Sequence, residues 1–382
     1  MNVLIVSPAF PPFSGVGGMR MGSLSKFLRD KGVNVRVLRN NPVLWGKQNL
    51  KAEVPNDIKI TDINANKNFF GNGILYFEEV RKVLENESVD LIIYSVGPFY
   101  TLLTSYLISK KYPQKHIIDF RDLWSYEKRG SRGFTKNIKF SIMKSLYRVI
   151  EKPAVNNSDG IVVVTPGDFD IMSRKYKNKK EKIQVILNGY EEIDFDENDK
   201  SNVDNAIQLV SLGKLGYYAP HLAKELFSAL EEIKIEGLDI ELIHVGPKEE
   251  AIESILSSIN DFRYECTGYV DYKKGLKIAY ESDIAIIVYN HPTGYGTKIF
   301  DYIACNKPII LVTEEANDLK ELVSKLKNGF VCKNKSQIKD SINYIYKNNV
   351  KTLDDKIIRN KYSRNNQNEL YYNHIIKMHN KV

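Results

Sequence analysis

The chain has 382 residues, of which 43% are hydrophobic and 27% charged, and its net charge is +8. This length exceeds one ordinary hydrophobic core, and the composition excludes a wholly disordered chain, so two globular domains are expected. No apolar run approaches the ~20 residues that span a bilayer, and the three cysteines form neither a disulfide framework nor a metal-ligand pattern, which favours a cytoplasmic protein.

Short β-branched runs alternate with longer amphipathic stretches along most of the chain. This order is typical of parallel sheets covered by helices on both faces, an α/β architecture. The first apolar run follows no basic segment and precedes no small-residue cleavage site, so we interpret it as a strand and not as a signal peptide. The predicted strands are residues 3–7, 34–38, 91–94, 116–119, 160–164, 182–187, 206–212, 240–245, 263–266, 284–288 and 308–312.

The strand–helix order occurs twice, on either side of the acidic and polar segment 191–205. We interpret this segment as an interdomain linker, with one domain at 1–190 and a second at 206–357. A terminal helix at 358–382 is expected to pack back on the first domain. The apolar contacts of that helix are expected from Leu370, Tyr371, Ile375, Ile376 and Met378.

Ligands of open α/β sheets bind beyond the carboxyl ends of the strands, so the loops there are the candidate sites. The first such loop, residues 8–20, contains Gly15, Gly17 and Gly18 and leads into an apolar-periodic helix. Glycines at a helix N-terminus expose N–H groups that suit a phosphate or a sugar, although a geometric turn would need glycines as well. The spacing differs from the dinucleotide-binding pattern G-x-G-x-x-G.

A second candidate site follows the strand at 116–119, where Asp119, Arg121 and Asp122 stand close together in the sequence. Asp122 is predicted to accept a proton or to hold an acceptor hydroxyl, and Arg121 to bind phosphate or orient Asp122. A purely structural Arg–Asp pair at the sheet edge is the alternative interpretation.

The positive charge is concentrated in one segment. Residues 110–152 contain 12 Lys and Arg side chains against four Asp and Glu, which equals the whole net charge of +8. Within 128–152, apolar residues recur at three- or four-residue spacing, which predicts an amphipathic basic helix. Such a helix either packs on the core with a solvated basic face or docks on an anionic membrane. The apolar positions are Phe134, Ile138, Ile142, Leu146 and Val149.

Two more glycine-containing loops follow strands in the second domain. After 206–212, Gly213 allows close backbone approach and Lys214 offers a positive charge for a leaving phosphate. After 284–288, N–H groups at Gly296 and Thr297 with Lys298 suit a diphosphate, and Asp301 lies one turn deeper, where it suits ribose hydroxyls. A capped helix with an acid in its first turn is the structural alternative.

Taken together, these segments resemble family 4 of the retaining glycosyltransferases, which have the GT-B fold. The matching stretches fall in the family's order and cover nearly the whole chain. They are residues 10–18, 120–124, 164–167, 188–190, 267–270 and 293–308.

The resemblance implies two Rossmann-like domains facing a cleft, with the acceptor on the first and a nucleoside-diphosphate sugar on the second. It implies transfer with retention and without a metal or cofactor. The catalytic residues are then expected to be Asp122, Arg121 and Lys298. The donor-binding residues are expected to be Gly17, Gly18, Gly213, Lys214, Tyr269, Val270, Gly296, Thr297, Lys298 and Asp301, with Tyr269 and Val270 at the base.

The chain departs from the family in two places. In the family's Glu-x7-Glu pair, Asp301 occupies the second position and Thr293 the first, which removes a usual carboxylate contact to the donor sugar. Lys214 matches one position of the family's basic pair, and no second partner is identified.

Three functions stay open at this point. A glycosyltransferase acting on a saccharide or lipid-linked saccharide in bacterial surface polysaccharide synthesis would suit a cytoplasmic protein peripheral on the inner face of the membrane. A non-catalytic homologue would keep the fold and serve in binding or assembly. A nucleotide-sugar epimerase would need acid and base residues that are not identified. Nucleic acid is not expected as a partner, because no binding module accompanies the charge.

Overall fold

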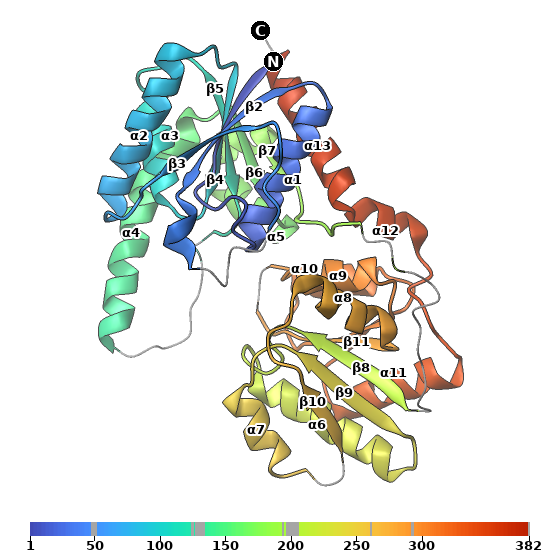
Figure 1. The fold of residues 1–382 in the computed structure, drawn as a ribbon. Helices are drawn as coiled ribbons and strands as arrows, with labels where there is room; N and C mark the ends of the chain where they lie inside the picture. The colour runs from blue at the N-terminus through green and yellow to red at the C-terminus, as the bar shows by residue number, and fades with distance from the viewer. Residues whose placement is uncertain are drawn as a thin grey trace. The chain divides into compact units, whose positions relative to one another are not determined.

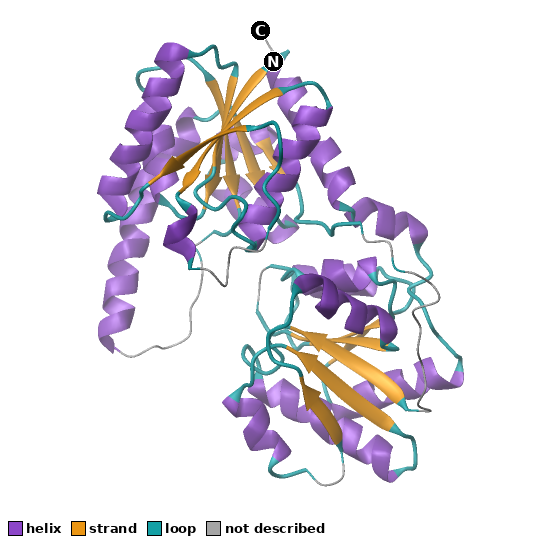
Figure 2. Ribbon diagram, viewed as in Figure 1, coloured by secondary structure: helices purple, strands orange, loops and turns teal. Residues whose placement is uncertain are grey.

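The computed structural model describes residues 1–46, 52–123, 126, 134–192, 195, 206–259, 262–291 and 294–380, without the side chains of 134–143. The chain divides into two compact units. Unit 1 comprises Met1–Asn188 and Gln367–Val382, and unit 2 comprises Gly189–Asn366. Each unit is a parallel sheet with helices on both faces (Figures 1 and 2).

Unit 1 contains a seven-stranded parallel sheet in the order β3-β2-β1-β4-β5-β6-β7. Its strands are β1 (Asn2–Val6), β2 (Asn34–Asn40), β3 (Lys59–Ile63), β4 (Leu91–Val96), β5 (Lys115–Phe120), β6 (Gly160–Val163) and β7 (Ile183–Val185). Its helices are α1 (Val16–Asp30), α2 (Phe69–Asn86), α3 (Tyr100–Ser109), α4 (Phe134–Asn157), α5 (Pro166–Lys175) and the 3-10 turns η1 (Pro42–Trp45) and η3 (Lys177–Lys182).

The two faces of this sheet bury different sets of helices, because successive side chains of a strand point to opposite faces. Ile5 and Ile93 pack with α1 and the C-terminal helix α13 (Arg364–His379). Leu4 and Ile92 pack with α2 and α3 on the other face. Strand order reverses between β1 and β4, so the loops after these strands flank the switch point where ligands bind in such sheets.

Unit 2 contains a six-stranded parallel sheet in the order β10-β9-β8-β11-β12-β13, with the order reversing between β8 and β11. Its strands are β8 (Ile207–Leu212), β9 (Ile240–Val245), β10 (Arg263–Cys266), β11 (Ile284–Val288), β12 (Ile309–Val312) and β13 (Gly329–Cys332). Its helices are α6 (Pro220–Ile235), α7 (Glu250–Leu256), α8 (Tyr272–Glu281), α9 (Lys298–Ala304), α10 (Asp318–Ser324), α11 (Lys335–Lys347) and α12 (Lys356–Tyr362). Helices α6, α7 and α11 line one face, with α8, α9 and α10 on the other (Figure 1).

The C-terminal segment differs from the single expected helix at 358–382. The chain forms two helices, α12 in unit 2 and α13, whose larger part lies in unit 1. They meet at Ser363, whose extended backbone ends the first helix. Tyr371, Ile375 and Met378 are buried in unit 1 as expected, but Leu370 is 40% exposed and is no core contact.

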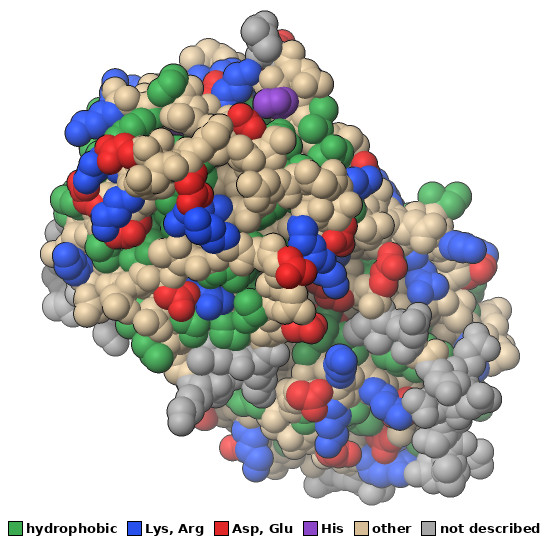
Figure 3. Space-filling view, turned by 45° about the horizontal axis from the view of Figure 1, so that its top comes forward, with side chains coloured by type: hydrophobic (Ala, Val, Ile, Leu, Met, Phe, Trp, Pro, Cys, Tyr) green, Lys and Arg blue, Asp and Glu red, His purple; other side chains and the backbone are tan. Residues whose placement is uncertain are grey.

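The basic segment 128–152 is described only in part: the helix α4 begins at Phe134, and its side chains are described from Lys144 onward. Leu146 packs against the core, as its spacing predicts. Val149 was expected on the same apolar stripe but is 70% exposed, and Ile150 is buried instead. On the face shown in Figure 3, basic and acidic side chains are interspersed. None of the described helices is long and apolar enough to cross a membrane.

Candidate functional site

The loops on either side of the unit 2 switch point carry most of the predicted donor-binding residues. The β8 loop begins at Gly213, whose φ of 71° is in the left-handed region that glycine adopts without strain. The β11 loop leads to Lys298 at the start of α9. The Lys298 Nζ donates a hydrogen bond of 2.7 Å to the carbonyl oxygen of Lys214, so the two loops are joined.

A buried polar cluster that sequence reasoning missed holds the β8 loop in shape. The Glu249 carboxylate accepts hydrogen bonds from the N–H of Leu215 at 2.6 Å and of Gly216 at 3.1 Å. The buried His244 Nε2 lies 2.6 Å from the Gly213 carbonyl oxygen and must donate to it, because that oxygen only accepts. Only the tertiary fold brings these groups together, since they come from the β9 end and the following loop.

The two lysines of the site differ in environment. Burial lowers the pKa of Lys298 to about 8, although the Glu249 carboxylate opposes this shift. The Lys214 ammonium lies 3.4 Å from the ring centroid of Tyr217, a cation–π contact on a partly exposed side chain. Lys298 is therefore a fixed, partly desolvated cation.

Asp301 lies one turn into α9, as predicted. Its Oδ1 accepts a hydrogen bond of 2.7 Å from the hydroxyl of Tyr272, the first residue of α8. Burial raises the pKa of Asp301 to about 6, while the Tyr272 bond and the Arg364 charge act in the opposite direction. Tyr272 also has a raised pKa, from burial and from the Asp301 charge, so it stays a donor at neutral pH. Tyr272 was not among the residues predicted for the site.

For the other predicted donor-binding residues of unit 2, the structure gives their exposure and backbone conformation. Tyr269 is 85% exposed and Val270 half-buried in the loop after β10. Gly296 is exposed with a φ of 63°, and Thr297 immediately precedes α9 without a side-chain cap bond. Thr293 lies outside the described residues.

In unit 1, Arg121 occupies the carboxyl end of β5 and donates a hydrogen bond to the carbonyl oxygen of Gly97, which follows β4. A Cβ at Gly17 or at Gly97 would overlap the Arg121 guanidinium. Burial lowers the pKa of Arg121, and the charges of Asp122 and Asp119 oppose this. In this structure, the space left by Gly17 is therefore occupied by Arg121.

Gly18 and Asp122 have different surroundings. A Cβ at Gly18 would overlap the carbonyl oxygen of Phe13, so this glycine is needed for the helix to pack on its own loop. Asp122 is exposed at the end of β5. Its carboxylate is thus accessible for the role in acceptor binding or proton transfer that we predict for it.

Asp119 forms a buried ion pair that was not predicted. Its Oδ2 accepts from Arg20 Nε at 3.2 Å and from Nη2 at 3.1 Å, with both side chains at most 5% exposed. Arg20 also donates to the Leu187 carbonyl oxygen at 2.7 Å, and its guanidinium lies 5.9 Å from the Tyr371 ring centroid. This pair joins α1, β5 and α13 beneath the glycine loop, so Asp119 is not aligned with Asp122 as a second carboxylate of a site.

Among the described residues, no three His, Cys, Asp or Glu side chains are grouped as metal ligands would be. The polar groups described near this switch point are the Lys298 ammonium bound to the β8 loop, the Lys214 side chain of that loop, and the Asp301 carboxylate one turn into α9. That combination suits a phosphate-bearing ligand with hydroxyl groups.

Two parallel-sheet units of this kind define the GT-B fold, and solved structures of that class cover the whole chain. The HepE protein of Anabaena, crystallised with UDP and glucose, aligns with a TM-score of 0.67 and 16% identity over 99% of this chain and 100% of its own. A putative UDP-N-acetylglucosamine 2-epimerase of Listeria monocytogenes aligns with a TM-score of 0.65 and 13% identity, covering 100% of this chain and 97% of its own. At these identities the likeness concerns the fold alone.

Comparisons of the amino-acid sequence identify the protein family within this fold class. The model of glycosyltransferase family 4 matches residues 17–192, and that of glycosyl transferases group 1 matches residues 206–348. An uncharacterized glycosyltransferase of Methanocaldococcus jannaschii is 22% identical over 289 residues, which are 73% of this chain and 70% of that protein. The chain belongs to the glycosyltransferases of the family 4 type with a GT-B fold.

Proposed function

We propose that this protein transfers a hexosyl or related sugar from a nucleoside-diphosphate sugar to a saccharide or lipid-linked saccharide acceptor. The observation that carries the proposal is the hydrogen bond that joins Lys298 to the Lys214 carbonyl oxygen across the unit 2 switch point, with Asp301 one turn further along α9. Relatives of the same fold are described in complex with UDP, UDP and glucose, and UDP-glucose. Their ligands make a nucleoside diphosphate the first donor class to test here.

Donor binding is proposed to use each group according to its chemistry. The Asp301 carboxylate accepts hydrogen bonds from ribose hydroxyls while Tyr272 holds it in place. Tyr269, which is largely exposed, is available to cover the base together with Val270. N–H groups at Gly296 and Thr297 are proposed to contact the diphosphate. The Gly213 N–H donates to the Val245 carbonyl oxygen at 2.7 Å, so Gly213 is proposed only to allow close backbone approach.

The same site favours departure of the nucleoside diphosphate. Negative charge grows on the leaving phosphate as the glycosidic bond to the donor breaks, and fixed cations stabilise that charge. With a pKa of about 8, Lys298 is mostly protonated at pH 7 and can also give up a proton near neutrality. Lys214 adds a second, more mobile charge. Metal-independent transfer with retention is proposed from the family resemblance.

The acceptor is proposed to bind mainly on unit 1. Asp122 is exposed at the end of β5, and Arg121 beside it is fixed by Gly97. Asp122 then orients the acceptor hydroxyl or receives its proton, and Arg121 holds the Asp122 carboxylate or an acceptor phosphate. The Gly17–Gly18 turn shapes this loop and contributes N–H groups near the donor phosphate or acceptor.

We also propose a cytoplasmic setting, with docking on the inner face of the membrane through segment 128–152 and a role in bacterial surface polysaccharide synthesis. The exposed Val149 next to Arg148 supports this, because an apolar side chain beside a cation suits a lipid surface.

One observation favours a second function. Thr293 stands where the family has the first glutamate of its Glu-x7-Glu pair, which contacts the donor sugar. A homologue without that carboxylate is able to keep a nucleotide or sugar site without catalysing transfer. A non-catalytic binding or assembly partner is therefore the alternative.

Thermal unfolding with UDP, GDP, dTDP and CMP, each free and as sugar conjugates, tests the proposal. A ligand at about 100 times its dissociation constant stabilises the folded state by roughly 2.7 kcal/mol. We expect one diphosphate to stabilise the protein selectively and the Asp301→Asn variant to show a clearly smaller stabilisation, about half of it for a tenfold loss of affinity. No stabilisation by any nucleotide would reject the donor site. Binding without transfer to any saccharide or lipid-linked acceptor would favour the non-catalytic alternative.

A further inference from the structure

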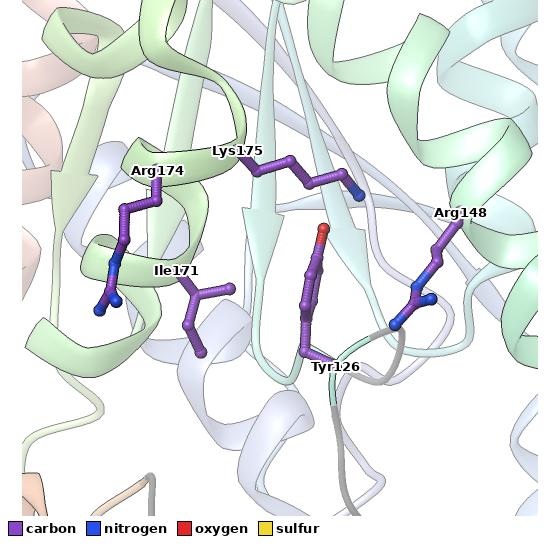
Figure 4. A pocket seen from close by; sticks show the side chains of 5 residues that line it. All are labelled: Tyr126, Arg148, Ile171, Arg174 and Lys175. Atoms are coloured by element: carbon purple, nitrogen blue, oxygen red, sulfur yellow. The ribbon is translucent and has the colours of Figure 1, made fainter.

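A basic pocket lies between α4 and α5 of unit 1, on elements that the donor site does not use. Its volume is about 520 Å³, and it is lined by Tyr126, Arg148, Ile171, Arg174 and Lys175. Tyr126 stands in the middle, between Arg148 extending from α4 and the three residues of α5 (Figure 4). Three cations thus line the pocket, and two of them, Arg148 and Lys175, lie over the Tyr126 ring.

One of the cations, Lys175, is positioned by a buried acid. Lys175 Nζ lies 3.0 Å from Oε1 of Glu151, which is fully buried, and 4.7 Å from the ring centroid of Tyr126. The Tyr176 hydroxyl donates to the same carboxylate at 2.9 Å. The Arg148 Cζ lies 5.6 Å from the Tyr126 centroid. One carboxylate against three cations leaves an excess of positive charge at the rim.

A second pocket of about 290 Å³ adjoins the first, since both are lined by Arg174. It adds Lys177 and Lys180 to the cations and has Asp170 as its acid. Ser173 also lines it. The Ser173 residue is only 8% exposed, and its hydroxyl has no hydrogen-bond partner in the described part of the chain. A buried hydroxyl without a partner is costly, so this donor is available for a ligand in the pocket.

The chemistry of the lining selects one class of ligand. Guanidinium and ammonium groups together with a hydroxyl donor match phosphate oxygens, and arginine binds them in a bidentate fork. Two adjoining cationic pockets match a phosphate ester or a diphosphate better than a single carboxylate. We propose that this double pocket binds a phosphate-bearing group, supplied either by a lipid headgroup or by a soluble phosphate compound.

The source of the phosphate is decided by binding assays on the whole chain. Inorganic pyrophosphate is titrated calorimetrically, and flotation measures binding to phosphatidylglycerol vesicles against phosphatidylcholine vesicles. The test variant is Arg148→Gln/Arg174→Gln, in which both arginines of the first pocket are neutralised and Lys175, which is paired with Glu151, is kept. The control is Lys26→Gln/Lys82→Gln, which removes the same charge from exposed positions on α1 and α2.

We expect the test variant to bind about thirtyfold more weakly, the combined effect of two cations near an anionic group, while the control keeps its affinity. Ser173→Ala is expected to weaken pyrophosphate binding without a change in charge. Vesicle binding without pyrophosphate binding assigns the site to a lipid headgroup, and the reverse result assigns it to a soluble phosphate compound. Binding of neither probe, or an equal loss in the control variant, would overturn the proposal. Because the proposed donor site also holds a diphosphate, pyrophosphate binding is assigned to the double pocket only where the Arg148→Gln/Arg174→Gln variant loses it.

Discussion

Replacing Asp301 by Asn is expected to stabilise the free protein and to weaken nucleotide binding. Burial raises the pKa of Asp301 from its ordinary 3.8 to about 6. Between these values the folded state holds a proton that the unfolded state has lost, so stability falls as the pH rises through this window. Above pH 6 the folded state keeps the full free-energy cost of holding this carboxylate ionised. At 1.36 kcal/mol per pKa unit, it amounts to about 3 kcal/mol at pH 7.

Asparagine removes this penalty because it carries no charge, and its amide oxygen still accepts from the Tyr272 hydroxyl. The gain from Asp301→Asn is therefore expected to be up to about 3 kcal/mol at pH 7 and to vanish below about pH 4. Nucleotide binding changes in the opposite direction, because the amide has one acceptor oxygen where the carboxylate has two. We expect an affinity loss of about tenfold or more, since hydrogen bonds to charged groups contribute ~1.5–3 kcal/mol.

The pH dependence of binding gives a second readout. If the ionised carboxylate is the binding form, the native affinity falls about tenfold at one pH unit below the pKa of Asp301, near pH 5. Asp301→Asn should show no such dependence. Urea unfolding at pH 7 and pH 4, with titration of the nucleotide selected in the thermal screen, provides both measurements. Equal stability of the two proteins at pH 7, together with equal affinity, would refute the assignment of a buried ribose acid.

Three other substitutions test the remaining clusters. Asp122→Asn should lower turnover with little change in donor affinity, and full activity would rule out its role toward the acceptor. Arg20→Met leaves the Asp119 carboxylate buried without its partner and should cost about 3–5 kcal/mol in urea unfolding, whereas Arg20→Met/Asp119→Leu should recover most of that loss. A cost below about 1 kcal/mol for the single variant would contradict a buried charge at that position. Glu249→Gln places an amide NH2 donor opposite one of the two loop N–H groups that the carboxylate accepts from. This change should destabilise unit 2 by about 2 kcal/mol and weaken nucleotide binding. Unchanged nucleotide affinity would show that the β8 loop is not part of the donor site.

Most of the strands that the sequence predicted have continuous apolar runs, although the edge strand Arg263–Cys266 does not. All eleven predicted strands overlap observed ones, and 240–245, 263–266 and 284–288 agree to the residue. The two missed strands, β3 and β13, lie at an edge of their sheets. Edge strands are covered less and need fewer apolar residues, so the run Lys59–Ile63 alternates with Thr and Asp and gives a weak signal.

The candidate site was predictable where it depends on position within a strand–loop–helix unit. Gly213, Lys214, Lys298 and Asp301 were found because each follows a recognisable strand, and ligands bind beyond carboxyl ends. Tyr272, Glu249 and His244 were not found, because they belong to other elements and carry no local pattern. Their hydrogen bonds to the β8 loop and to Asp301 exist only because separate elements pack together in the folded chain.

The sequence by itself determined the α/β class, the two sheets and the loops that contain the candidate site residues, because strand period, glycine turns and helix entry are local properties. The tertiary structure decided which of these residues meet. It placed Lys298 on the Lys214 carbonyl, buried Asp301 behind Tyr272, and paired Asp119 with Arg20 instead of aligning it with Asp122. Burial and pairing depend on neighbours far along the chain, and they set the pKa values and hydrogen bonds from which chemistry is inferred.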